Sequence, residues 1–132
     1  FFTGHLIKRF GTLAVMGVGV VLNLACVAVA LSGQDLHQFT IALFLLGVGW
    51  NFLFTGSTTL ALQSYRPEEK DRVQAAINVC VFATMAVTSL AAGALVTTRG
   101  WELLNYGSLL PIGLTGLALL WLALRQLRSV AA

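Results

Sequence analysis

The chain has 132 residues, of which 58% are hydrophobic and 10% are charged, and its mean hydropathy is +0.86. These values lie far from the averages of soluble proteins and exclude a soluble globular domain. The net charge of +3 does not indicate nucleic-acid binding, because the basic residues are dispersed at the ends of apolar segments. We therefore expect an integral membrane protein with no separate soluble domain.

Four long segments contain no Asp, Glu, Lys or Arg, and they span residues 12–31, 39–62, 73–98 and 103–124. A helix rises about 1.5 Å per residue, so about 20 apolar residues cross the hydrocarbon core of a bilayer. Each segment is long enough. The sequence predicts an all-α membrane protein with four transmembrane helices and a single transmembrane region over residues 1–132.

The first connection, residues 4–11, is short and basic, with a glycine at each end. Its two glycines, Gly4 and Gly11, predict a tight turn. The chain does not begin with Met, and residues 1–3 resemble the end of an earlier apolar segment. We expect the chain to be part of a longer protein.

The second apolar segment is the richest in polar side chains. Asn51, Thr55 and Thr58 follow helical spacing and share one face. Asn51 and its neighbour Trp50 lie about 17 to 18 Å along this helix, close to the bilayer midplane. A polar group at that depth indicates a substrate cavity. The alternative is a hydrogen bond between Asn51 and Asn23, at a similar depth in the first segment, which would only join two helices.

The connection that follows carries most of the charged residues. Pro67 suits the first position of a helix, and acidic residues after it complement the positive end of the helix dipole. These acidic residues are Glu68, Glu69 and Asp71. Glu68 and Arg72 are spaced for an ion pair along the helix. Asn78 follows about 8 Å inside the third apolar segment and is a further cavity candidate.

Basic charge alternates between the connections. Seven of the eight Lys and Arg residues lie before the first segment, between the second and third, or after the fourth. The other two connections contain only Asp35, Arg99 and Glu102 as charged residues. The positive-inside rule therefore predicts that both ends of the chain face the cytoplasm.

Catalytic and metal-binding constellations are missing from the sequence. It contains no catalytic set of Ser, His and Asp or of Cys and His at one depth, and His5 and His37 fall on opposite sides of the predicted membrane. We expect neither an enzyme nor a cofactor or metal site. The two cysteines, Cys26 and Cys80, differ in predicted depth, so a disulfide between them is not expected.

Three motifs resemble the C-terminal part of major facilitator superfamily transporters, and together they cover nearly the whole chain. The first is Gly4-x-Leu6-x-x-Arg9-x-Gly11, which resembles the cytoplasmic motif Gly-x-Leu-x-Asp-Arg-x-Gly of that family, with Lys8 in place of the acidic residue. The second is Gly47-x-Gly49-Trp50-Asn51 followed by Gly56-x-x-Thr59-Leu60. The third is Tyr65-Arg66-Pro67-Glu68-Glu69-Lys70-x-Arg72-x-Gln74-Ala75-x-x-Asn78, which is similar to the connection between the tenth and eleventh helices in some bacterial members.

This resemblance implies a twelve-helix bundle in which the four segments are helices nine to twelve. It implies secondary transport of a small molecule by alternating access, in a bacterial inner membrane, with the remaining helices and the lipid bilayer as partners. The second segment would then be central, the third would flank the cavity, and the first and fourth would be peripheral. The substrate-cavity candidates are Trp50, Asn51, Thr55, Thr58 and Asn78. The cytoplasmic gate candidates are Gly4, Arg9, Gly11, Glu68, Glu69, Asp71 and Arg72.

Two other interpretations of the residues stay open. A self-contained four-helix efflux protein that dimerises is one, although such a pump would be expected to carry an acidic residue within a span, and none is present. A non-transporting membrane scaffold or assembly subunit is the other, because packing through small residues would be sufficient for it.

Overall fold

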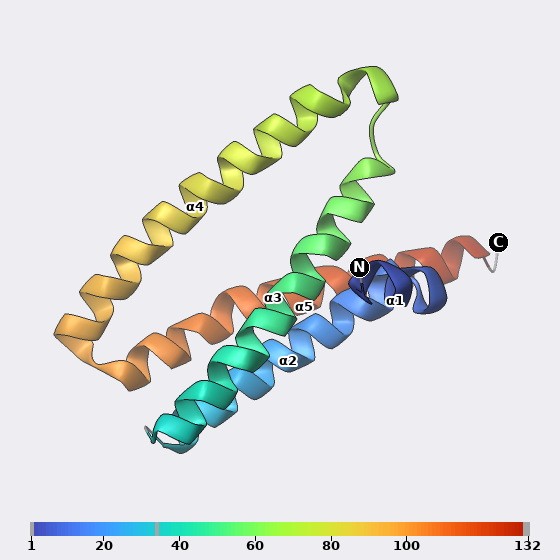
Figure 1. The fold of residues 1–132 in the computed structure, drawn as a ribbon. Coiled ribbons are helices and arrows are strands. Elements are labelled where there is room, and N and C mark those ends of the chain that lie inside the picture. The colour runs from blue at the N-terminus through green and yellow to red at the C-terminus, as the bar shows by residue number, and fades with distance from the viewer. Residues whose placement is uncertain (1, 34, 131–132) are drawn as a thin grey trace.

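The computed structural model describes residues 2–33 and 35–130, with only the backbone described at residues 99, 129 and 130. The described part of the chain contains helices and no strand. In chain order the elements are α1 (Phe2–Phe10), α2 (Thr12–Ser32), α3 (Leu36–Leu62), the short 3-10 helix η1 (Pro67–Glu69), α4 (Lys70–Arg99) and α5 (Trp101–Val130) (Figure 1). Within the described residues, four helices (α2, α3, α4 with η1, and α5) are long and apolar enough to cross a membrane. The predicted all-α class is confirmed.

The predicted tight turn at residues 4–11 is wrong, because this connection forms the helix α1. Its basic residues Lys8 and Arg9 are exposed, whereas Leu6 and Ile7 are half-buried where α1 packs on α2 and α3. The connection is therefore an amphipathic helix with one face on the protein. Gly11 has a φ of +87°, which a residue with a side chain rarely adopts, and the direction of the chain changes there.

Helices α2 and α3 form a tightly packed antiparallel hairpin (Figure 1). A Cβ atom added to Gly19 would lie 3.0 Å from the carbonyl oxygen of Gly49, and one added to Gly49 would lie 3.0 Å from that of Gly19. Gly56 lies directly against the Met16 side chain in the same interface. Small residues permit this approach, and dispersion forces between the closely packed backbones stabilise it in a membrane.

The start of α3 is fixed by a reciprocal cap. Asp35 accepts a hydrogen bond from the backbone N–H of Gln38, and the Gln38 side chain accepts one from the backbone N–H of Asp35 at 3.3 Å. This arrangement satisfies two N–H groups that the helix leaves without an internal partner. The link between α2 and α3 can therefore be short.

Trp101 joins three helices at one end of the bundle. Its indole Nε1 donates a hydrogen bond to the carbonyl oxygen of Ala30 in α2 at 3.0 Å. Its ring centroid lies 6.1 Å from that of Phe39 in α3. Gly100, with a φ of +85°, forms the one-residue break between α4 and α5 and places Trp101 at the start of α5. The chain therefore turns from α4 into α5 at Gly100.

Helix α4 is covered least by the rest of the described chain. It packs mainly on α5, and the ribbon diverges from α3 along most of its length (Figure 1). Its large apolar side chains, among them Val79, Phe82 and Leu90, are exposed. Because α4 is apolar and uncovered, lipid or further helices must surround it.

Candidate functional site

The predicted cavity residues of α3 lie on the side of the helix that faces away from α2. Gly49 and Gly56 are buried against α2, and Asn51 stands about 200° around the helix from Gly49. Trp50 and Asn51 are exposed, and Thr55 and Thr58 are half-buried. The glycine interface therefore orients these four side chains away from the hairpin, as a cavity wall requires.

Trp50 and Phe54 form a parallel aromatic stack on this side of α3. Their ring centroids are 4.9 Å apart and their planes differ by 9°. The fractional exposure is 49% for Trp50 and 37% for Phe54. Sequence reasoning selected Trp50 and missed Phe54, although their i, i+4 spacing was the signal that could have found it.

The alternative role for Asn51, a hydrogen bond to Asn23, is wrong. Asn23 is buried, donates from Nδ2 to the carbonyl oxygen of Gly19 at 2.8 Å, and packs on Gly49. Asn51 instead accepts a hydrogen bond at Oδ1 from the Thr3 hydroxyl at 2.7 Å. The physical reason is the close contact between Gly19 and Gly49, which directs Asn23 to a different face of α3 from the one that carries Asn51. The contact with Thr3, which links α1 to α3, was not predicted.

Thr58 and Thr59 of α3 satisfy their hydroxyl donors within the helix. The Thr58 hydroxyl donates to the carbonyl oxygen of Phe54 at 2.8 Å, and the Thr59 hydroxyl donates to that of Thr55 at 2.8 Å. Such back-bonding leaves the lone pairs of the Thr58 oxygen able to accept a further hydrogen bond. The Thr58 hydroxyl oxygen is therefore available as a hydrogen-bond acceptor next to the aromatic stack.

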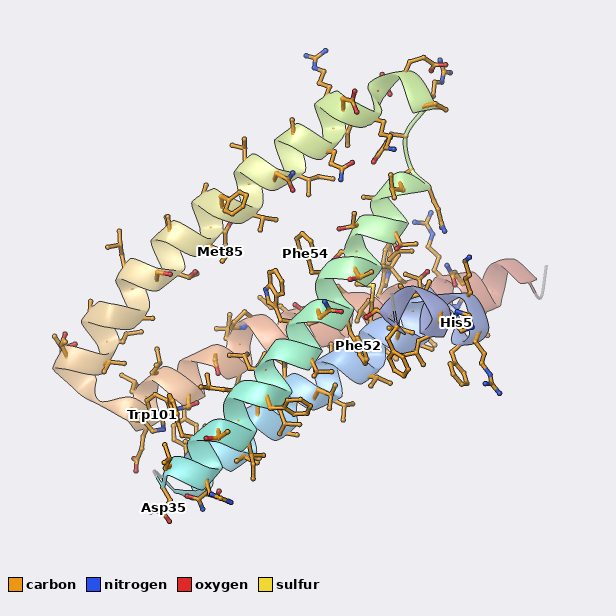
Figure 2. The ribbon with its side chains drawn as sticks, viewed as in Figure 1. His5, Asp35, Phe52, Phe54, Met85 and Trp101 are labelled. Carbon is orange, nitrogen blue, oxygen red and sulfur yellow. The ribbon has the colours of Figure 1, made fainter. Side chains whose placement is uncertain are left out.

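Across from α3, helix α4 presents Asn78 and Met85 on one face, since seven residues separate them. Both side chains are exposed. Figure 2 shows Phe54 of α3 and Met85 of α4 extending from facing sides of their helices. The third predicted segment thus turns a face with polar and soft apolar groups towards the candidate residues of the second.

The predicted cytoplasmic gate residues fall into two separate groups in this conformation. Arg9 belongs to α1, which packs on α2 and α3, and its guanidinium carbon lies 5.5 Å from the centroid of the Phe10 ring. Glu68 and Glu69 form part of η1, and Asp71 lies in the first turn of α4 beside Arg72. All four are exposed. Gly4 lies within α1 in open space, and Gly11 forms the break after it.

A groove of about 240 Å³ lies elsewhere, between α2, α3 and α5 near Trp101. Its wall is mainly apolar, and it contains no predicted site residue. Its polar members Asn23, Asn105 and Ser108 donate to backbone carbonyl oxygens of their own helices, at 2.8, 2.9 and 2.7 Å. Because these donors are already satisfied, the groove offers less recognition chemistry than the face of α3.

Several curated bacterial transporters are similar to this chain. It is 41% identical over 106 residues to the riboflavin transporter RfnT of Brucella anthropi, a match that covers 80% of this chain and 27% of that protein. It is 30% identical over 105 residues to YddS and 35% identical over 95 residues to YdeG, both uncharacterized MFS-type transporters of Bacillus subtilis. These matches cover 78% and 70% of this chain, and 24% and 21% of the relatives. The chain thus spans about a quarter of the length of these relatives, and no solved structure matches it significantly.

The family model of the Major Facilitator Superfamily matches residues 1–131. That family consists of transporters built as twelve-helix bundles and not of enzymes, and the four apolar helices agree with a multi-pass membrane protein. Because the match extends over almost the whole chain and three relatives support it, the chain belongs to the Major Facilitator Superfamily.

Proposed function

We propose that this chain supplies helices nine to twelve of a secondary transporter that moves a small molecule by alternating access. In such transporters the substrate site lies near the bilayer midplane, between repeats that rock around it. The observation that carries the proposal is the face of α3 that turns away from the hairpin. On this face Trp50 and Asn51 lie about 18 Å before the end of α3, with Thr55 and Thr58 beside them, a depth that supports a site near the midplane.

The proposed substrate is riboflavin or a closely related small molecule. The support for it is the 41% identity to a riboflavin transporter over 80% of this chain, a region that includes the candidate face. Riboflavin combines a flat heteroaromatic ring with a polyhydroxyl chain, so a site for it needs apolar surface together with hydrogen-bonding groups. The face of α3 offers both kinds of group.

The test is an uptake measurement with the full-length protein in a bacterium that can neither make nor import riboflavin. We expect expression to restore growth on low external riboflavin and to produce accumulation of radiolabelled riboflavin. A Gly49→Leu variant, which cannot keep the close packing of α2 and α3, serves as the inactive control. Absence of accumulation at normal membrane abundance of the parent protein would refute riboflavin import.

The two other interpretations, a self-contained four-helix efflux protein and a membrane scaffold, are less well supported. A family match over residues 1–131 favours a part of a facilitator bundle over both. We also propose that the protein resides in a bacterial inner membrane with α1, the connection 63–72 around η1 and the end of α5 on the cytoplasmic side, because these regions contain seven of the eight basic residues.

A further inference from the structure

The stacked pair of Trp50 and Phe54 has a free aromatic surface. Two rings that stack 4.9 Å apart and nearly parallel cover one face of each other, and each keeps its outer face. Both side chains retain a large exposed fraction. The pair is also held on a regular helix, which restricts both rings to a few rotamers. A flat surface is therefore preformed on α3.

The space next to the Trp50 ring is open. A helical side chain leans towards the turn that precedes it, and Gly47 lies in that turn, three residues before Trp50. A Cβ atom added to Gly47 would meet no atom within 4 Å. The contrast with Gly49, which α2 covers closely, shows that the two glycines of this motif differ in role. Gly47 thus leaves open space in the turn before Trp50.

Hydrogen-bonding groups border this surface on one edge. Asn51 is exposed, and its amide group has donors beyond the Oδ1 atom that accepts from Thr3. The Thr58 oxygen can accept a further hydrogen bond, as its own donor is used within α3. On the facing side of α4, the Met85 side chain extends towards α3 (Figure 2). A thioether packs favourably against aromatic rings.

We propose that Trp50 and Phe54 form a stacking platform for the flat heteroaromatic ring of the substrate, with Trp50 in direct contact and Phe54 positioning the indole. The inference rests on the proposed function and specifies which part of the substrate this helix recognises. An electron-rich indole attracts an electron-poor isoalloxazine ring, and stacking of this kind does not depend on hydrogen-bond pattern. Asn51 then faces the polar chain at the edge of the ring.

The experiment uses the purified full-length transporter and two probes, riboflavin and lumiflavin, which has the same isoalloxazine ring with a methyl group in place of the polyhydroxyl chain. The Kd is measured by equilibrium dialysis, and stacking is measured by quenching of probe fluorescence. An excited isoalloxazine ring is quenched by reversible electron transfer from an indole in contact with it. Trp50→Leu should raise the Kd at least about fivefold for both probes and remove the quenching.

Trp50→Phe is the decisive variant, because it keeps a flat ring and loses the electron donor. It should leave the Kd within about threefold of the parent value and still remove the quenching. Phe54→Leu should raise the Kd for both probes. Trp121→Leu and Phe44→Leu are matched controls, since these exposed aromatic residues lie outside the platform, and both should behave as the parent protein.

The outcomes separate the platform from the proposed transport. If riboflavin binds and Trp50→Leu changes neither Kd nor quenching, the platform is refuted and riboflavin transport stands. If both probes bind and depend on Trp50 while uptake fails, riboflavin transport is refuted and the platform stands. Binding of neither probe refutes both. If Trp50→Leu does not fold, Trp50→Phe decides, because it keeps an aromatic ring at position 50; bound probes whose fluorescence stays quenched in that variant would overturn the platform.

Discussion

The glycines of α2 and α3 influence which hydrogen-bond partner each nearby asparagine finds. Asn23 is 7% exposed and satisfies its amide on the Gly19 carbonyl oxygen, four residues earlier in its own helix. Asn51 lies outside that interface and contacts Thr3 of α1. Two asparagines at similar predicted depth thus have different roles: Asn23 packs within the hairpin, and Asn51 lies on the face proposed for substrate.

Substitution of Asn51 tests that assignment. If Asn51 contacts substrate or cavity water, Asn51→Ala should weaken substrate binding by about 1 to 3 kcal/mol, because a hydrogen bond is lost or left unsatisfied. Asn23→Ala should mainly lower thermal stability, since its side chain is buried between helices. Calorimetric titration of riboflavin into each purified full-length variant gives the affinities.

Thr3→Ala is the control for the observed contact of Asn51. If Asn51 serves only to hold α1 on α3, then Thr3→Ala and Asn51→Ala should lower the melting temperature alike and leave the dissociation constant unchanged. That result would remove Asn51 from the site.

At the scale of helices, the glycines of α3 divide into those that permit packing and those that leave space. Gly49→Ala should destabilise the protein by about 1 to 3 kcal/mol, because its Cβ atom would lie 2.6 Å from Asn23 Nδ2 and 3.0 Å from the Gly19 carbonyl oxygen. Gly47→Ala, two residues earlier and in open space, should not lower stability. Thermal unfolding of the two full-length variants in the same detergent measures the difference, and equal melting temperatures would contradict this packing of α2 on α3.

Helix α1 also illustrates what local sequence leaves undetermined. The glycines at positions 4 and 11 predict a turn, and helix propensity alone penalises Gly4. The helix forms because Leu6 and Ile7 can pack on α2 and α3, and this tertiary contact outweighs the cost of one glycine. Gly11, with positive φ, is the residue whose conformation matches the expectation of a turn.

At the scale of the whole molecule, the distribution of basic residues predicts topology. Single cysteines at Leu36 and Ser64, in a protein without Cys26 and Cys80, should differ in reaction with an impermeant thiol reagent on intact cells. Leu36 is 80% exposed at the start of α3 and should react, whereas Ser64, beyond the other end of α3, should not. The opposite labelling pattern would invert the proposed orientation. Gln34 is an alternative labelling position in the connection between α2 and α3, but it lies outside the described residues.

The candidate gate residues lead to a prediction about conformational change. Arg9 lies over Phe10 in this structure, and its candidate partners Glu68, Glu69 and Asp71 belong to η1 and α4. We expect Arg9 to pair with one of them when the cytoplasmic side closes, which favours the outward-open state. An exposed ion pair contributes at most about 1 kcal/mol, so the population shift should be modest.

Charge reversal at Arg9 should therefore reduce transport, and reversal of the correct acidic partner should restore part of it. Uptake by single and double variants of the full-length protein, analysed as a double-mutant cycle, identifies the partner. Strictly additive effects for all three acidic residues would exclude the pair.

The sequence by itself determined the four apolar helices, the basic alternation of the connections and the helical face shared by Asn51, Thr55 and Thr58, because length, charge and a period of 3.6 residues are properties of a single segment. Only the tertiary structure decided that Gly19 packs on Gly49 and that the Trp101 indole donates a hydrogen bond to the Ala30 carbonyl oxygen. It also decided that Asn51 accepts a hydrogen bond from Thr3 and that Phe54 stacks on Trp50. In a membrane both lipid and protein accept an apolar face, so hydropathy does not select which faces meet. Shape and local hydrogen bonds make that choice, and both depend on residues far apart in the chain.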